Sequence, residues 1–318
     1  MSGRDKRAGA KGARPGRGPK RPPKRRAGSP GKGPKRGSRP DSRDGGKRSN
    51  AGKGSGTGKG SGAGKGSGGQ RPKGLDGTQV EGRQAVRELL LAGRRRAREV
   101  YLGSEVERAD VVQDIVGLAG ELRVPVKTVS RSKLDQMSRT DAPQGVVAMA
   151  EQIPGEELAH LCDAGSDRPF LLALDGVTDP GNLGALLRIA ECAGVSGVVI
   201  PRHRAARVTP TVTKAAAGAV EYLPMALVGG LPSAIEEMKA AGVWVVGLDA
   251  GGDTSIHDLE VGADGVCLVL GAEGSGLSRL VRERCDLIAS IPLHGRLASL
   301  NVASAGAIAT YEVARRRG

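Results

Sequence analysis

Three polar segments in the C-terminal half of the chain carry the side chains best suited to chemistry. In the first, residues 175–188 (DGVTDPGNLGALLR), Asn182 stands where a helix N-cap is expected and Arg188 lies on the helix that follows. Gly184 comes four residues before Arg188, so it lies one turn away on the same face and would leave room for a ligand beside the arginine. A binding arginine and an exposed arginine on an ordinary capped helix both fit this segment.

The second segment is residues 271–277 (GAEGSGL). Its three glycines would let the backbone approach a ligand closely, and Glu273 stands among them. It lacks the Lys-Ser/Thr end of a P-loop, and its GxxGxG spacing differs from the GxGxxG of dinucleotide-binding folds. Alone it is a weak signal for a ligand.

In the third segment, residues 291–301 (IPLHGRLASLN), Ser299 and Asn301 flank Leu300. An extended backbone would place both polar side chains on one side. The helix that follows begins with small residues (VASAGAIA), so it should pack very closely against a neighbour. A serine N-cap before an ordinary core helix is the plainer alternative.

The elements that would position these segments alternate between strand and helix. Strands are predicted over 170–174, 197–200, 244–248, 266–270 and 287–291. Helices are predicted over 183–193, 211–220, 232–241, 277–284 and 302–316. This alternation is typical of an α/β fold in which helices cover both faces of a parallel sheet. Ligands bind where loops leave the carboxyl ends of such strands, so we expect chemistry after residues 174, 270 and 291.

Residues 76–153 predict a second, smaller α/β unit. Apolar residues recur at helical spacing over 82–91 and 110–123, and strands are predicted over 99–103, 124–129 and 145–150. Four arginines follow the first helix: Arg94, Arg95, Arg96 and Arg98. They fit either a solvated surface or a contact to RNA. The polar residues 154–168 form the linker to residues 169–318.

Charge is divided very unevenly along the chain. Residues 1–75 hold 23 Lys and Arg against three acids, whereas the other 243 residues hold 26 against 31. The first part is rich in Gly and Pro and nearly free of large apolar residues, so we expect a disordered tail. Such a tail is either an electrostatic arm that holds RNA phosphates or a solubilising segment.

Several classes of protein are excluded by composition. No stretch approaches 18 apolar residues, and the basic N-terminus lacks the apolar core of a secretory signal. The four cysteines and four histidines show no zinc spacing, so we expect no metal site and read the cysteines as buried, reduced thiols of a cytoplasmic protein. With five aromatic residues in 318, base stacking on aromatic platforms is not expected.

Taken together, the three segments resemble the signature motifs of the SpoU (TrmH-type) RNA 2′-O-ribose methyltransferases of the SPOUT superfamily. DPGNLGALLR, LVLGAEGSGLSRL and IPLHGRLASLNVASAGAIA match the three motifs in order. Residues 76–153 resemble the substrate-binding domain of this family, which is similar to ribosomal protein L30e. That domain points to the ribosomal-RNA guanosine methyltransferase (RlmB-like) branch.

The resemblance implies S-adenosyl-L-methionine (SAM) as the methyl donor, a C-terminal trefoil knot and a homodimer. It implies cofactor contacts at Gly271, Ile291 and Leu300. The catalytic positions that it implies are Arg188, Asn182, Glu273, Ser299 and Asn301. In the family proposal, the arginine acts with an RNA phosphate to activate the ribose hydroxyl. We favour orientation and charge stabilisation by Arg188, with Glu273 as a rival base.

The expected partner is RNA, and the expected reaction is 2′-O-methylation of a guanosine in 23S ribosomal RNA. Phosphate contacts are expected from Arg202, Arg204 and Arg207. The folded part has net negative charge and must therefore concentrate its positive charge locally. Three alternatives remain: a transfer-RNA guanosine, the ribosomal adenosine modified for thiopeptide resistance, or a non-catalytic RNA-binding factor in ribosome assembly.

Overall fold

The computed structural model describes residues 74–106, 109–163, 168–203, 205, 207–261 and 265–317. The tail predicted over 1–75 lies outside these residues, except for its last two. Leu75 is buried, and its N–H donates a hydrogen bond to the Ile153 carbonyl at 2.9 Å. The folded part of the chain therefore includes Leu75, which the sequence had assigned to the tail.

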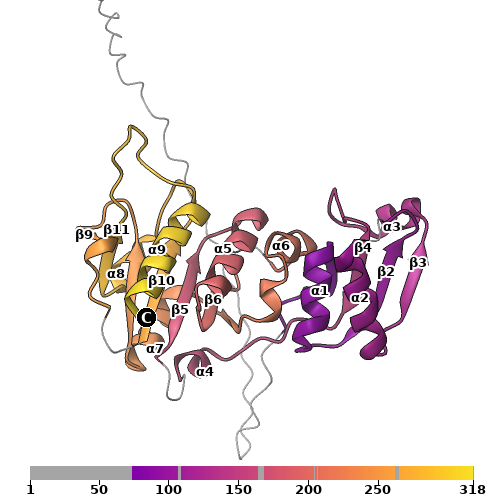
Figure 1. Cartoon of the computed structure of the whole chain (residues 1–318). Coiled ribbons are helices and arrows are strands. Elements are labelled where there is room, and N and C mark those ends of the chain that lie inside the picture. Colours follow the sequence, from indigo (N-terminus) through magenta and orange to yellow (C-terminus); the bar gives the residue numbers. More distant parts are fainter. Residues whose placement is uncertain are drawn as a thin grey trace, which may run out of the picture. The chain divides into compact units, whose positions relative to one another are not determined.

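Among the described residues, seven strands form a wholly parallel sheet in the order β7-β6-β5-β10-β8-β11-β9 (Figure 1). Their bounds are β5 Phe170–Asp175, β6 Gly197–Pro201, β7 Met225–Val228, β8 Val243–Leu248, β9 Thr254–Ser255, β10 Gly265–Gly271 and β11 Leu287–Ser290. The predicted parallel sheet is confirmed. The edge strands β7 and β9 were not predicted, because they are too short to show the alternation of side chains that marks a strand.

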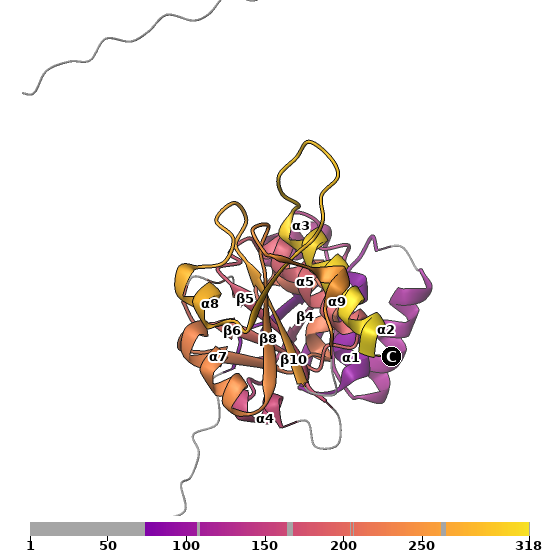
Figure 2. The same ribbon diagram turned by 90° about the vertical axis from the view of Figure 1, so that its left-hand side faces the viewer.

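Helices cover both faces of this sheet, as predicted (Figure 2). Leu172 and Leu174 of β5 face one apolar core, whereas Leu171 and Ala173 face another, because successive strand residues point in opposite directions. The first core contains α5 (Pro180–Cys192), α6 (Pro210–Ala215) and α9 (Val302–Arg317). The second contains α4 (Leu158–Cys162), α7 (Leu231–Ala240) and α8 (Arg279–Arg284).

The prediction of a single helix over residues 211–220 is wrong. Helix α6 ends at Ala215, and a short 3₁₀ helix, η1 (Ala219–Glu221), follows it. Between them the backbone turns through positive φ at Ala217 (50°) and Gly218 (93°). A Cβ on Gly218 would lie 2.3 Å from the Glu88 Cβ. The break in the helix therefore lets Gly218 lie close against the residue Glu88 of the small α/β unit. Helix propensity could not predict this contact, because the two residues are distant in the sequence.

The described residues 74–153, which we call the small region, form a four-stranded sheet in the order β1-β4-β2-β3. Its elements are β1 Gln79–Glu81, α1 Arg83–Ala92, β2 Ala97–Gly103, α2 Asp110–Glu121, β3 Val126–Val129, α3 Arg131–Met137 and β4 Val146–Ala150. Leu89 of α1 and Ile115 of α2 pack in one core, as their spacing predicted. Strand β1 and helix α3 were not predicted.

The four cysteines lie in unlike surroundings. Cys162 and Cys267 are buried and Cys285 is partly buried, which agrees with the prediction. Burial raises the pKa of the Cys162 thiol to about 11, so this thiol stays protonated at neutral pH. Cys192 is exposed at the end of α5, and its prediction as a buried thiol is wrong.

Among the described helices, none is both long and apolar enough to cross a membrane.

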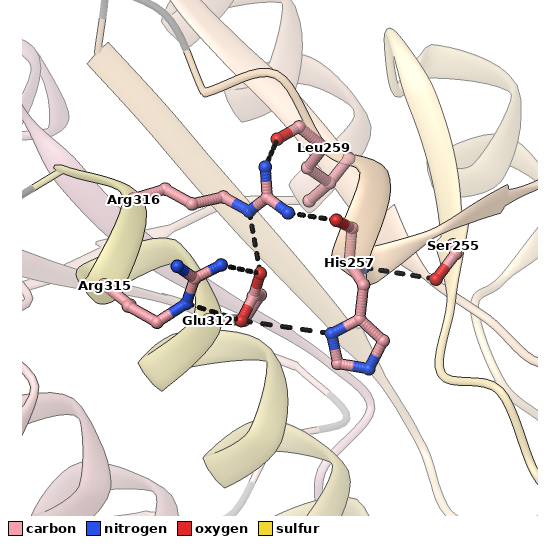
Figure 3. A network of polar contacts seen from close by, with 6 residues as sticks. All are labelled: Ser255, His257, Leu259, Glu312, Arg315 and Arg316. Carbon is pink, nitrogen blue, oxygen red and sulfur yellow. Dashed lines mark hydrogen bonds and ion pairs between the residues drawn. The ribbon is translucent and has the colours of Figure 1, made fainter.

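The end of α9 is tied to the loop around His257 by a network of polar contacts (Figure 3). Glu312 accepts hydrogen bonds from Arg315 at 2.8 Å and from Arg316 at 2.7 Å. Arg316 also donates to the carbonyls of His257 and Leu259. Hydrogen bonds from these two arginines lower the pKa of Glu312 from 4.5 to about 2. The ionised carboxylate therefore helps to orient Arg316, which ties the end of α9 to this loop.

This network should give the folded state a specific dependence on acid. The folded-state pKa of Glu312 is depressed, so its contribution to stability is complete above pH 4.5 and is lost as the pH falls toward 2. We expect Glu312→Gln to lower the Tm at neutral pH, and the difference from the unmodified chain to shrink through that window. Thermal melts of both proteins at a series of pH values test this. A Tm difference that stays constant down to pH 2 would contradict it.

Candidate active site

The carboxyl ends of β8, β10 and β11 surround a cavity of about 450 Å³. Five of the predicted residues line it: Gly271, Glu273, Ile291, Ser299 and Leu300. Two of the three expected loops, those after residues 270 and 291, thus form the cavity together. Asp175, the last residue of β5, accepts a hydrogen bond from the Ser278 N–H at 2.6 Å, which ties the end of β5 to the residue that follows the second segment.

The glycine loop after β10 is tightly folded. Ala272 and Gly276 exchange backbone hydrogen bonds of 3.1 and 3.0 Å, and Gly274 and Gly276 have positive φ of 79° and 64°. A Cβ on Gly271 would lie 2.2 Å from the carbonyl carbon of Gly276. The glycines therefore serve first to let two backbone segments touch, and the loop that results lines the cavity.

The loop after β8 was not among the loops expected from the sequence, and it contributes Asp249 to the lining. Asp249, directly after β8, accepts hydrogen bonds from the N–H groups of Gly251 and Leu277 and pairs with Arg282 at 2.8 Å. Burial alone would raise the pKa of Asp249, but these backbone donors and Arg282 together lower it. The carboxylate is thus ionised at the cavity wall. The end of a parallel strand was the available signal, since the loop after residue 248 meets the same criterion as the other three.

Polar side chains of all three segments meet at one point. Glu273 Oε1 accepts hydrogen bonds from Asn182 Nδ2 and from Asn301 Nδ2, each at 2.6 Å. Asn301 Nδ2 also donates to Asn182 Oδ1 at 3.1 Å. Residues up to 119 positions apart thus form one cluster, which we call the amide–carboxylate cluster. It joins the first segment to the cavity wall.

The helix caps differ from those predicted. Asp179, not Asn182, is the N-cap of α5, and its Oδ1 accepts a hydrogen bond from the Asn182 N–H at 2.7 Å. Pro180 suits the first helical position because its fixed φ is helical and a free N–H is not needed there. Asn301 Oδ1 accepts from the N–H groups of Ala303 (2.9 Å) and Ser304 (3.3 Å), so Asn301 rather than a serine caps α9. These caps leave the Asn182 side chain free to reach Glu273.

The space predicted beside Arg188 is filled by protein. A Cβ on Gly184 would lie 2.4 Å from the Ala215 Cβ and 2.8 Å from the Val212 carbonyl oxygen. Gly184 thus lets α5 and α6 pack closely, and its prediction as room for a ligand is wrong. The Arg188 side chain itself is exposed on α5. Arg188 and Asn182 are not among the described residues that line the cavity.

The predicted phosphate contacts lie between β6 and α6. Arg202 and Arg207 are exposed there, whereas Arg204 lies outside the described residues.

The small residues at the start of α9 pack closely against their neighbours, as predicted. A Cβ on Gly306 would lie 2.3 Å from Leu186 Cδ2 of α5 and 2.9 Å from Leu270 Cδ1 of β10.

Two family models match the chain. Residues 169–311 match the SpoU rRNA Methylase family, and residues 79–154 match RNA 2'-O ribose methyltransferase substrate binding. A Pseudomonas aeruginosa protein named 23S rRNA (guanosine-2'-O-)-methyltransferase RlmB is 40% identical over 242 residues, which make up 75% of this chain and 96% of that protein. The chain belongs to the SpoU rRNA methylase family. A Pseudomonas putida protein of the same name is 37% identical over 242 residues, with the same coverage.

Solved structures of SpoU methyltransferases agree with this membership. AviRb from Streptomyces viridochromogenes, in complex with AdoMet, is 27% identical, has a TM-score of 0.62 and is matched over 75% of this chain and 89% of its own. An AdoMet-bound rRNA methyltransferase from Sinorhizobium meliloti is 28% identical, with a TM-score of 0.63 over 75% and 87% of the two chains. This SpoU-family chain is an RNA ribose 2′-O-methyltransferase that uses SAM.

The cavity fits that cofactor. Its volume of about 450 Å³ suits a molecule of nucleoside size. Leu248, Leu270 and Leu300 supply apolar surface for a flat ring, and the glycine loop exposes backbone groups. Asp249 and Glu273 place carboxylates in the wall, which favour a positively charged ligand. The bound cofactor supplies a methyl group that is activated on a positive sulfonium.

Proposed function

We propose that the chain methylates the ribose 2′-hydroxyl of a guanosine in 23S ribosomal RNA. The observation that carries this proposal is the amide–carboxylate cluster beside the cavity, in which all three motif segments meet. The choice of guanosine and of 23S RNA is supported by the name of the P. aeruginosa relative. The match to this chain covers 96% of that relative. We propose the cytoplasm as the place of the reaction.

Each site residue has a proposed task. A ribose hydroxyl is a weak nucleophile at neutral pH, so the enzyme must orient it and help to remove its proton. The exposed Arg188 guanidinium would hold the hydroxyl and the neighbouring phosphate and stabilise developing negative charge. Ser299, in the cavity wall, offers a hydroxyl that can donate or accept a hydrogen bond. Phosphates farther along the RNA would meet Arg202, Arg204 and Arg207.

Glu273 is better suited to holding the site together than to removing a proton. One of its carboxylate oxygens already accepts hydrogen bonds from the side-chain amides of Asn182 and Asn301, so this oxygen is engaged in holding the three motif segments together. A glutamine keeps an oxygen that can accept the same two bonds. We therefore expect Glu273→Gln to lower kcat by no more than about tenfold, the cost of weakening two charge-assisted hydrogen bonds.

Steady-state kinetics of Glu273→Gln and Glu273→Ala, with SAM affinity measured in parallel, test this role. The alanine variant loses both accepted bonds and should be the more damaged of the two. A glutamine variant as inactive as the alanine variant would make Glu273 the general base and overturn the assignment.

We also propose the knot and the homodimer. Strand β10 lies between β5 and β8, and β11 lies beyond β8, yet α9 returns to pack on α5. The chain after β11 must therefore cross back over the sheet, which is the path that a trefoil knot requires. Exposed apolar side chains of the loop after β11 and of α9 would be covered by a second copy: Leu297, Ile308 and Tyr311.

The first experiment is incubation of the purified chain with isotopically labelled SAM and unmodified 23S RNA, followed by nucleoside mass spectrometry. Labelled 2′-O-methylguanosine is the expected product. Labelled 2′-O-methyladenosine would keep the reaction and move the target to the thiopeptide-resistance adenosine. Label in transfer RNA alone would assign the enzyme to that substrate. No label in any RNA would favour a non-catalytic assembly factor.

A further inference from the structure

Arg95 and Glu221 form a buried ion pair between the small region and the rest of the fold. Arg95 Nε and Nη2 donate to the two carboxylate oxygens of Glu221 at 2.8 and 2.6 Å. Both side chains are only 2% exposed. The remaining Nη1 group of Arg95 donates to the carbonyls of Gly77 and Glu151. This arginine is thus fully engaged within the protein, unlike the solvated or RNA-binding arginine that its neighbours suggested.

Further contacts surround the pair. Tyr222 donates from its hydroxyl to Glu88 Oε2 of α1 at 2.7 Å, and Lys214 of α6 donates to the Ala142 carbonyl. Leu75 and Ile153 belong to the same apolar core as α5, α6 and α9. Both regions lie within one compact unit. The pair therefore sits in an interface that excludes water from it.

A buried ion pair has a particular effect on such an interface. Its net contribution to stability is small, because the attraction must first offset the loss of hydration of both charges. Its effect on geometry is large, because any sliding of the two regions would leave two charges unpaired in apolar surroundings. An apolar contact of the same area would tolerate small displacements. A two-pronged arginine–carboxylate pair also fixes the angle between the partners.

We infer that Arg95 and Glu221 are positioning residues, which hold the small region at one fixed place relative to the SAM cavity. An RNA bound to both regions would then present one nucleotide to that cavity. The inference deepens the proposed function, since it concerns recognition of the same RNA. It predicts that loosening the pair weakens productive RNA binding, whereas the chemical step is retained once RNA is saturating.

The test uses Glu221→Gln in the full chain, with Arg316→Met as the matched control. The control breaks an ion pair to Glu312 at the end of α9, away from the small region. We expect Glu221→Gln to raise the KM for RNA about tenfold with nearly unchanged kcat, as when the binding-competent arrangement is populated about one tenth of the time. Amide hydrogen exchange should rise in α1 and η1 but not in β10. The control should leave the KM unchanged.

A second variant separates positioning from stability. Arg95→Met/Glu221→Met replaces both charges by apolar side chains, so its Tm should recover relative to that of Glu221→Gln while its KM for RNA stays high. A wild-type KM in this double variant, or equal exchange in β10 and η1 of Glu221→Gln, would reduce the pair to a structural role and overturn the inference. The hydrogen-exchange comparison of Glu221→Gln with the unmodified chain needs no RNA. If the unmodified chain proved inactive on 23S RNA, that result would contradict the proposed substrate and would leave the exchange test of the ion pair intact.

Discussion

Replacing Arg188 by alanine should abolish methyl transfer while leaving SAM binding nearly unchanged. The side chain is exposed on α5 and is not among the described residues that line the cavity, so its loss removes no contact to the cofactor. It would remove the cation that orients the ribose hydroxyl and stabilises negative charge in the transition state. We expect kcat to fall at least about 100-fold, as for other lost transition-state donors. Single-turnover methylation and calorimetric titration with SAM measure the two effects separately.

The matched control for this variant is Arg284→Ala. Arg284 is also exposed, but it lies on α8 and pairs with Glu236, on the opposite face of the sheet from α5. Its loss should leave turnover within about twofold, as is usual for surface substitutions. Near-normal turnover in Arg188→Ala would remove Arg188 from the mechanism. An equal loss of SAM affinity would show instead that the substitution disturbs the cavity.

Replacing Gly271 by alanine should abolish SAM binding. A Cβ at this position would lie 2.2 to 2.5 Å from backbone atoms of Gly276 and Leu277. Backbone atoms cannot move aside as a flexible side chain can, so the loop after β10 must open. That loop lines the cavity with residues 271–276, and its backbone groups would no longer be presented to the ligand. Calorimetric titration with SAM should show at least about a 100-fold weaker Kd, as expected when several hydrogen bonds are lost together.

Gly229→Ala is the control for this substitution. A Cβ on Gly229 would meet no atom within 4 Å, and the residue follows the edge strand β7. This variant should bind SAM normally. Because Gly271→Ala could also impair folding, circular dichroism of both variants accompanies the titrations. A folded Gly271→Ala protein with normal SAM affinity would show that the close approach to Gly276 is dispensable.

Much of the fold followed from patterns that are local in the sequence. Strands such as β5 and β10, which are buried on both faces, appear as continuous apolar runs, and the helices between them show their own spacing. The order of strand and helix was then enough to predict a parallel sheet. The rule that ligands bind at the carboxyl ends of such strands led to Gly271, Glu273 and Ser299, which do line one cavity.

The tertiary structure decided which of several equally suitable residues performs each local task. Asp179 and Asn182 can both cap a helix, and only the hydrogen bond from the Asn182 N–H to Asp179 distinguishes them. Gly184 is compatible with a neighbouring ligand or a neighbouring helix, and the position of α6 made it a packing glycine. These outcomes depend on neighbours that no local pattern specifies.

The arginine cluster after α1 shows the same limit most clearly. Arg94, Arg95 and Arg96 are alike in type and adjacent in the chain, so composition predicts one fate for all three. Only Arg95 is buried, because Glu221, 126 positions away, meets it in the interface of the two regions. The sequence by itself therefore determined that the core is a parallel sheet, the family motifs and most of the loops that carry chemistry, since these depend on local periodicity and spacing. Only the tertiary structure decided which charges pair, which glycines face protein and how the small region is held, since each of these depends on contacts between distant parts of the chain.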